Sequence, residues 1–249
     1  MGKHTTITIA GRDILLYTPA GKPKRLILAL HAGNGSARGY RELLSPLLTD
    51  DLPACVAFPQ GTSAVGAATR RTWNSGHIGW QTVDDVSWLS TVIQASPVSR
   101  VYVVGYSNGG MMAYRLAAEH PDLVIAFAAF AATIGGRRDT EAPLSVNVPT
   151  EGPAVPVLHV HGWQDTIVRP LGGQSSNSDR VDLPVLHGLD MWRAHNGIAG
   201  DLPIQLDVVH QTAAGDDLSF LRYQMRRGVG HEWQDDYPGM MLDFFVDVG

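Results

Sequence analysis

The sequence predicts an α/β fold in which helices cover both faces of a mainly parallel sheet. Two observations lead to this prediction. Short continuous apolar runs, typical of strands buried on both faces, recur along the chain. Segments with apolar residues at helical spacing separate these runs, and each can form the crossover that a parallel strand pair needs. Because the alternation continues over the whole length, we expect a single domain spanning residues 1–249.

The N-terminal segment is predicted to form an antiparallel hairpin. Residues 4–10 alternate Thr and Ile at strand spacing, Gly11 opens a turn, and residues 14–18 return. The further strands are predicted at residues 25–30, 54–58, 100–104, 123–129, 155–161, 204–209 and 220–225. Helices are predicted at residues 40–48, 111–120, 186–195 and 240–248, and a capping box at residues 82–85 opens another.

A long stretch rich in Gly, Ser, Thr and Ala, residues 60–81, shows no pattern of a regular element. Loops of this length are usually functional or disordered. Asp84 and Asp85 follow this stretch, and we interpret them as capping residues of the next helix rather than as catalytic acids.

Composition indicates an ordinary globular protein of 249 residues with 44% hydrophobic residues and a net charge of −5. Its arginine pairs are scattered rather than grouped, which argues against a nucleic-acid surface. No run approaches the roughly 18 apolar residues of a membrane span, and the start lacks the apolar core of a signal peptide. We therefore expect no membrane partner and a cytoplasmic location. Cys55 is the single cysteine, so no intrachain disulfide can form.

A Gly-x-Ser-x-Gly motif at residues 105–109 is the most informative feature of the chain. An apolar run leads into it and a strongly helical run follows it. A Ser on a sharp turn between a strand and a helix is typical of a nucleophile elbow, which predicts Ser107 as a nucleophile. An ordinary glycine turn is the alternative.

A serine hydroxyl needs a base to take its proton and a carboxylate to orient the base. Asp165 lies just beyond a predicted buried strand, and His231 lies in a Gly-flanked loop beyond the last strand. These positions predict Asp165 as the acid and His231 as the base. Asp190 and Asp207 fit less well because they fall inside a predicted helix and strand.

His159 and His161 lie two residues apart on one predicted strand, shortly before Asp165. A metal site is a conceivable use of these three residues. We favour a supporting role instead, in which each imidazole packs and hydrogen-bonds near the site, and we expect no metal and no cofactor.

An oxyanion that forms during attack on a carbonyl needs preorganised N–H donors. The residue after the nucleophile usually supplies one donor and an earlier strand-end loop supplies the other. These rules predict Asn108 and Gly33 as the two donors, with a plain Gly-rich turn as the alternative for Gly33.

Five segments in this order resemble the α/β-hydrolase fold, and within it the polyhydroxybutyrate depolymerase and feruloyl esterase-like group of serine esterases. They are residues 30–37 (LHAGNGSA), 73–74 (WN) ahead of 83–86 (VDDV), 105–117 (GYSNGGMMAYRLA), 161–168 (HGWQDTIV) followed by Gly172 and Gly173, and 230–233 (GHEW).

The resemblance implies that Ser107, Asp165 and His231 are nucleophile, acid and base, with Gly33 and Asn108 in the oxyanion hole. It also implies that three tryptophans lie near the acyl or alcohol pocket, namely Trp73, Trp163 and Trp233.

The chain departs from that group at Ala32 and Gly33, where Gly and Cys are usual, and lacks the cysteines common beyond Trp73. A small soluble ester is therefore the expected substrate. The sequence predicts a serine-dependent carboxylic ester hydrolase. The same triad could act on a thioester, an amide or an acyl-transfer acceptor, and a non-catalytic binding protein is a more distant alternative.

Overall fold

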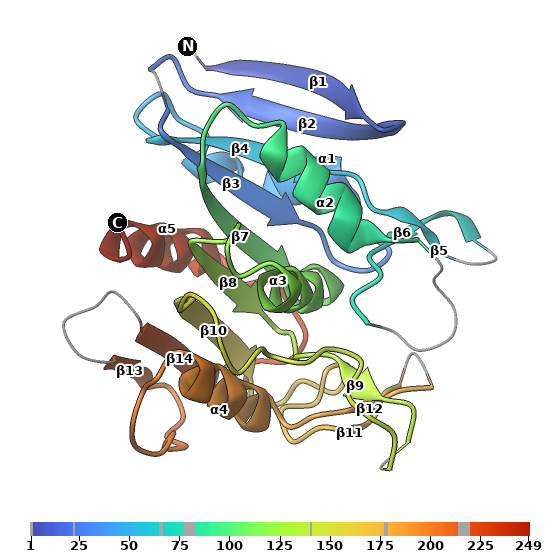
Figure 1. Ribbon diagram of the computed structural model, residues 1–249, viewed down its shortest axis with the longest axis vertical. Coiled ribbons are helices and arrows are strands. Elements are labelled where there is room, and N and C mark those ends of the chain that lie inside the picture. Colours follow the sequence, from blue (N-terminus) through green and yellow to red (C-terminus); the bar gives the residue numbers. More distant parts are fainter. Residues whose placement is uncertain are drawn as a thin grey trace.

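A nine-stranded sheet forms the centre of the described part of the chain, in the order β1-β2-β4-β3-β7-β8-β10-β14-β13 (Figure 1). The computed structural model describes residues 2–21, 23–64, 67–76, 83–139, 141–176, 179–213 and 220–249. The strands of this sheet are β1 (Lys3–Ile9), β2 (Arg12–Thr18), β3 (Arg25–Leu30), β4 (Ala54–Pro59), β7 (Arg100–Tyr106), β8 (Ala126–Phe130), β10 (Val157–Gly162), β13 (Val209–Ala213) and β14 (Phe220–Arg226).

The middle of the sheet is parallel and its two margins are antiparallel. Neighbouring strands from β4 to β14 pair in parallel. The β1–β2 hairpin and the β2–β4 pair are antiparallel, and so is the pair of β13 with β14. The predicted mainly parallel sheet with an N-terminal antiparallel hairpin is confirmed.

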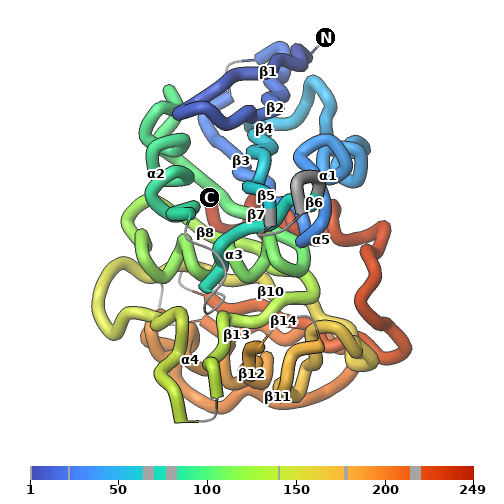
Figure 2. The backbone as a smooth tube through the Cα atoms, turned by 90° about the vertical axis from the view of Figure 1, so that its right-hand side faces the viewer, coloured from blue at the N-terminus to red at the C-terminus, as the bar shows by residue number. Residues whose placement is uncertain are grey.

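Helices cover both faces of the sheet. In the view along the sheet, α2 (Asp85–Gln94) and α4 (Val185–His195) lie on one side, and α1 (Ala37–Leu43) and α5 (Tyr237–Asp247) lie on the other (Figure 2). The helix α3 (Asn108–Glu119) lies on the same side as α2 and α4 (Figure 1). Each face therefore has its own layer of helices.

The side chains of β3 show why its apolar run is continuous. Leu26, Leu28 and Leu30 are buried in the cluster that includes α2, α3 and α4. Ile27 and Ala29 are buried in the cluster that includes α1 and α5. Because successive residues of a strand point to opposite faces, a strand covered on both faces needs an apolar residue at every position.

The stretch 60–81, predicted without regular structure, contains a short hairpin of β5 (Thr62–Ala64) and β6 (Ala67–Thr72). Its strands are rich in small and polar residues, and a register shift between Ser63 and Ala64 interrupts their pairing. A strict alternation of apolar and polar residues, on which the strand prediction relies, is therefore missing. Residues 65–66 and 77–82 of this region lie outside the described residues.

The helix after this stretch begins two residues later than the predicted capping box implies, because its N-cap is residue 84 and not residue 82. Asp84 is the N-cap of α2, and its side chain accepts a hydrogen bond from the Ser87 N–H. Asp85 is buried and binds the Arg12 guanidinium at 2.6 Å. The capping interpretation is therefore confirmed for Asp84, whereas Asp85 forms a buried ion pair instead. Thr82 lies outside the described residues.

The strand predicted at residues 204–209 is wrong in position, because β13 runs from Val209 to Ala213 and only an isolated bridge forms at Leu206. Asp207 adopts a positive φ of 64°, which breaks the extended backbone before β13 starts. Leu202 and Leu206 instead pack against the core cluster that contains Met225 of β14, and Leu206 forms its bridge with Met225.

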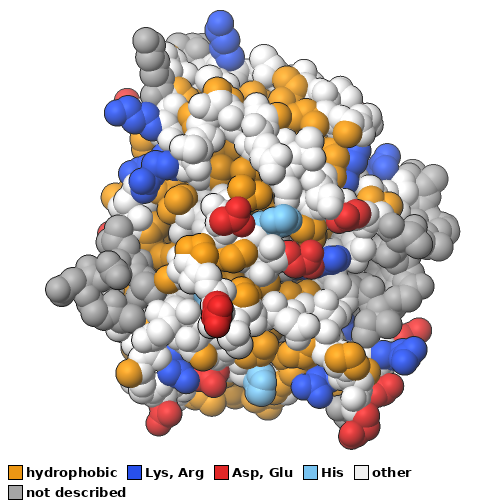
Figure 3. All heavy atoms as spheres, viewed as in Figure 1, with side chains coloured by type: hydrophobic (Ala, Val, Ile, Leu, Met, Phe, Trp, Pro, Cys, Tyr) orange, Lys and Arg blue, Asp and Glu red, His pale blue; other side chains and the backbone are white. Residues whose placement is uncertain are grey.

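A three-stranded ribbon lies beside the carboxyl ends of the central strands (Figure 1). It consists of β9 (Gly136–Arg137), β11 (Gly173–Gln174) and β12 (Val181–Asp182). On the face covered by α2, α3 and α4, acidic and basic side chains are interspersed (Figure 3). None of the helices in the described ranges has the length and apolar character that a membrane crossing requires.

Candidate active site

A tight turn between β7 and α3 holds Ser107. Its backbone has φ 54° and ψ −121°, a conformation that costs energy for a residue with a side chain. A Cβ atom on Gly105 would collide with the backbone of Gly109, and one on Gly109 would collide with the Leu30 carbonyl. The two glycines therefore allow α3 to start directly against β7 and β3, and the turn projects Ser107 at the carboxyl edge of the sheet.

Ser107, His231 and Asp165 come together at this edge from three different loops. His231 Nε2 lies 2.9 Å from Ser107 Oγ, and His231 Nδ1 lies 2.7 Å from Asp165 Oδ2. The other two candidate acids lie elsewhere, since Asp190 pairs with Arg193 and Asp207 accepts a hydrogen bond from the Arg227 amide.

Asp165 is buried and firmly held. Its Oδ1 accepts hydrogen bonds from the Ile167 and Val168 amides, each at 2.8 Å. Burial opposes ionisation, but the hydrogen bonds from His161 and His231 outweigh it and hold the pKa of the Asp165 carboxyl below its ordinary value. The carboxylate is therefore available as an acceptor for His231.

Tyr106 holds His231 in place through a hydrogen bond and a ring contact. Its hydroxyl donates to the His231 carbonyl at 2.9 Å, and its ring stacks on the imidazole with centroids 5.5 Å apart. Because the Asp165 carboxylate only accepts hydrogen bonds, His231 Nδ1 carries a proton. In the neutral imidazole, Nε2 then has a free lone pair directed at Ser107 Oγ.

The two residues predicted as oxyanion donors lie next to each other. A Cβ atom built on Gly33 would lie 3.4 Å from Asn108 Cβ. Asn108 is the first residue of α3, where a backbone N–H has no acceptor within the helix. Its side chain is otherwise engaged, because Oδ1 accepts from Trp73 N at 2.8 Å and Nδ2 donates to Ser75 Oγ at 3.0 Å.

His31 fixes the loop that carries Gly33, a role that the sequence analysis did not assign. Gly61 N–H donates to His31 Nε2 at 3.0 Å, so Nδ1 carries the proton and donates to the Ala32 carbonyl at 2.7 Å. The Ala32 carbonyl and the Gly33 N–H belong to one planar peptide and point in opposite directions. Holding the carbonyl therefore orients the N–H. The position of His31 at the end of a buried strand was the available signal.

Acidification should destabilise this loop, because burial lowers the pKa of His31 from its usual 6.5 to about 4. Between these values the unfolded chain binds a proton at His31 that the folded chain does not bind, so stability falls as pH falls through this range. We expect the loss in Tm from pH 7 to pH 5 to be about 5 °C smaller in His31→Gln than in wild type. His187→Gln, at an exposed position of α4, should keep the wild-type slope. Equal slopes for wild type and His31→Gln in thermal melts would contradict the prediction.

The structure places the three tryptophans differently from one another. Trp73 is fully buried, and its indole N–H donates to the His31 carbonyl at 2.9 Å, so it supports the loop that carries Gly33. Trp233 packs edge-on against Tyr40 and Tyr106 behind His231. The substrate-binding role of each tryptophan stays a prediction, because burial in the core and a place in a pocket select the same residue type.

Trp163 lines a cavity of about 260 Å³ next to Asp165, together with residues 164–166 and 169–172. It is half-buried, and its amide is tied to the Arg226 carbonyl at 2.7 Å. Of the three tryptophans, it is the one that lines this cavity. Among the described residues, no three His, Cys, Asp or Glu side chains are arranged to hold a metal ion.

Two curated relatives share part of the chain. A bifunctional acetylxylan esterase/xylanase of Neocallimastix patriciarum is 27% identical over 170 residues, which cover 64% of this chain and 22% of that protein. NocK of Nocardia uniformis subsp. tsuyamanensis, described as a candidate esterase, is 34% identical over 163 residues, which cover 64% of this chain and 44% of NocK. The chain thus spans less than half the length of either relative.

Solved structures resemble the fold over nearly its whole length. The acetyl xylan esterase from Aspergillus awamori has a TM-score of 0.67 at 16% identity and covers 99% of this chain and 100% of its own. TT1662 from Thermus thermophilus has a TM-score of 0.61 at 18% identity, with 100% and 98% covered. Residues 25–178 match the alpha/beta hydrolase fold family. The chain is therefore a member of the alpha/beta hydrolase fold family.

Proposed function

We propose that this protein is a serine-dependent carboxylic ester hydrolase that acts on a small soluble ester without a cofactor. The observation that carries the proposal is the hydrogen-bonded line from Asp165 through His231 to Ser107. It joins a nucleophile, a base and an orienting carboxylate, which is the arrangement that activates a serine for acyl transfer.

The reaction would proceed in two halves. His231 Nε2 takes the proton of Ser107 Oγ as this oxygen attacks the ester carbonyl carbon, and the carbonyl oxygen becomes an oxyanion. His231 then gives the proton to the leaving alcohol, which leaves an acyl group on Ser107. Water attacks the acyl group with His231 again as base, and the carboxylic acid and free Ser107 are released.

The N–H groups of Gly33 and Asn108 would stabilise the oxyanion. Their adjacency supports this role, as do the contacts that fix the Ala32–Gly33 peptide through His31. Donors that are oriented before the reaction need no reorganisation as charge develops, and this makes them effective in a buried site.

The names of the relatives support an ester substrate over the alternatives. The two curated proteins and the Aspergillus structure are named as esterases or esterase-like proteins. The same triad could act on a thioester, an amide or another acyl acceptor. The thioester alternative has some support, because the acyl-protein thioesterase 2 of Zea mays has a similar structure. The finer resemblance to polyhydroxybutyrate depolymerases stays a prediction, as does a cytoplasmic location.

A panel of esters tests the proposal directly. Acetyl, butyryl, octanoyl and feruloyl esters should be hydrolysed in buffer containing a chelator, faster than matched thioester and amide analogues. A fluorophosphonate probe should label Ser107 stoichiometrically. Labelling without ester hydrolysis would favour the thioester, amide or acyl-transfer alternatives, and a folded protein that shows neither would favour a binding protein.

The activity should fall on the acid side of neutrality. A protonated imidazole cannot accept the proton of Ser107, and histidine side chains titrate between about pH 5 and 8. We expect kcat/KM to rise with pH across this interval and to follow a single ionisation. A flat profile over the interval, measured with an ester whose own hydrolysis is subtracted, would contradict His231 as the base.

A further inference from the structure

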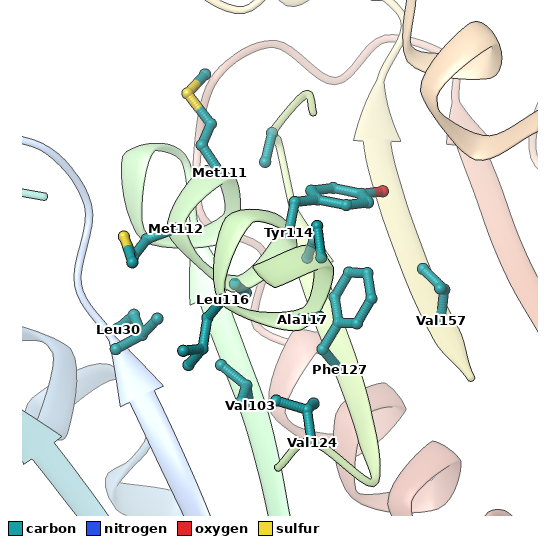
Figure 4. Packing of buried hydrophobic residues seen from close by; sticks show 14 of the residues in the cluster. Leu30, Val103, Met111, Met112, Tyr114, Leu116, Ala117, Val124, Phe127 and Val157 are labelled. Atoms are coloured by element: carbon teal, nitrogen blue, oxygen red, sulfur yellow. The ribbon is translucent and has the colours of Figure 1, made fainter. Parts of the chain in front are cut away.

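Three buried polar side chains form a line from α3 to β10 behind the site. Tyr114 is the start, and Figure 4 shows its ring extending from α3 toward the strand that carries Val157. Its hydroxyl lies 2.8 Å from His159 Nδ1, and His159 Nε2 lies 3.3 Å from His161 Nδ1. Both imidazoles are fully buried, and their rings stack with centroids 5.4 Å apart.

The end of this line fixes the direction of every hydrogen bond in it. His161 Nε2 lies 2.8 Å from the Val168 carbonyl, which can only accept, so Nε2 carries a proton. In a neutral ring His161 Nδ1 then accepts from His159 Nε2, and His159 Nδ1 accepts from the Tyr114 hydroxyl. Every group in the line has a partner with both rings uncharged. Burial, and secondly the neighbouring His161, lower the pKa of His159 well below its ordinary value, which agrees with an uncharged ring.

The line reaches the Asp165 carboxylate by two routes. His161 Nε2 lies 3.4 Å from Asp165 Oδ2, the same oxygen that binds His231. The Val168 carbonyl accepts from His161 while the Val168 amide donates to Asp165 Oδ1 at 2.8 Å. His161 thus contacts one carboxylate oxygen directly and binds the carbonyl of Val168, the residue whose amide binds the other oxygen.

We propose that Tyr114, His159 and His161 form a one-directional hydrogen-bond chain that positions the Asp165 carboxylate for His231, with His161 as the positioning residue. The inference rests on the function proposed above, in which Asp165 orients the base. These hydrogen bonds connect the helix that follows Ser107 to the loop that carries Asp165. Since catalysis depends on angstrom-level placement of these groups, loosening the chain should lower turnover without weakening substrate binding.

The test compares variants of His161 and Tyr114. His161→Leu removes every polar contact of the ring, and we expect kcat to fall about 10- to 100-fold with KM changed less than about twofold. His161→Gln keeps a side-chain N–H donor for the Val168 carbonyl and should recover a large part of this loss. Tyr114→Phe removes only the hydroxyl and should lower kcat about two- to fivefold.

Tyr223→Phe is the matched control. Tyr223 is also a buried tyrosine, but its hydroxyl donates to the Pro203 carbonyl at 2.6 Å, outside the line. It should cost similar thermal stability to Tyr114→Phe and leave kcat within about twofold of wild type. Equal losses of kcat in the two Tyr→Phe variants would show that the Tyr114 hydroxyl has no specific effect on the site, and would overturn the proposal.

A spectroscopic readout separates this inference from the proposed function. The proton shared by His231 and Asp165 should give a far-downfield proton NMR resonance in wild type and in Tyr223→Phe, and His161→Leu should broaden or abolish it. If His161→Leu loses this resonance but the wild type hydrolyses no ester, only the proposed function is refuted. Hydrolysis with kcat and the resonance both unchanged in His161→Leu would refute the positioning role. If His161→Leu does not fold, unchanged kcat in His161→Gln and Tyr114→Phe refutes it equally.

Discussion

Replacement of Ser107 by Ala should lower ester turnover by at least about 10⁴-fold. The variant keeps the elbow, since Ala at a φ of 54° carries the same Cβ as Ser, but no atom remains that can form the acyl-enzyme. The activity left would be that of the oxyanion hole and substrate binding acting on water. Initial rates of wild type and variant on one acetyl ester measure the effect.

Ser90→Ala is a suitable control for this experiment. Ser90 is buried and its hydroxyl donates to the Val86 carbonyl at 2.9 Å within α2, away from the site. Its removal should leave turnover within about twofold of wild type. Retention of wild-type turnover by Ser107→Ala, with the fluorophosphonate still bound elsewhere, would refute the acyl-enzyme mechanism.

Asp165→Asn should lower kcat by about 10⁴-fold while the fold is preserved. The amide oxygen can still accept from the Ile167 and Val168 amides, so the amide nitrogen is left to face His231 Nδ1. Nδ1 must then accept, which places the ring proton on Nε2, opposite Ser107 Oγ. An imidazole in this tautomer cannot take the serine proton.

Asp84→Asn is the control for this variant, because it makes the same Asp-to-Asn change outside the candidate site. Asp84 caps α2, and Asn caps helices about as well as Asp, so this variant should keep both stability and turnover. Steady-state kinetics of the two variants at pH 7 to 8 give the comparison. A fall of less than about tenfold in Asp165→Asn would show that His231 is oriented by another group.

The parts of the fold that could be predicted from sequence are those governed by local rules. A strand covered on both faces needs apolar residues at its buried positions, and β3, β7 and β8 show this pattern. The elbow glycines are required by backbone contact, and their spacing between an apolar run and a helical run predicted the turn. The β5–β6 hairpin lacks any alternating pattern, and its strands could not be recognised.

The candidate site was predictable to the extent that its residues lie at strand ends. Ser107, Asp165 and His231 all follow predicted strands, and the structure brings His231 within hydrogen-bond distance of both other residues. The contacts that hold them depend on which side chains face each other across the sheet and its helices. The hydrogen bond from Tyr114 to His159 joins residues 45 positions apart, and no pattern in either local sequence predicts it.

The distance along the chain between the site residues makes activity a reporter of complete folding. His231 lies 124 positions after Ser107 and 66 after Asp165, and it follows the strand that pairs with β10. Contacts between such remote segments form late and slowly, because loop closure must precede them. During refolding, recovery of ester hydrolysis should therefore lag behind helix formation. The time at which activity returns should report when β14 joins the sheet.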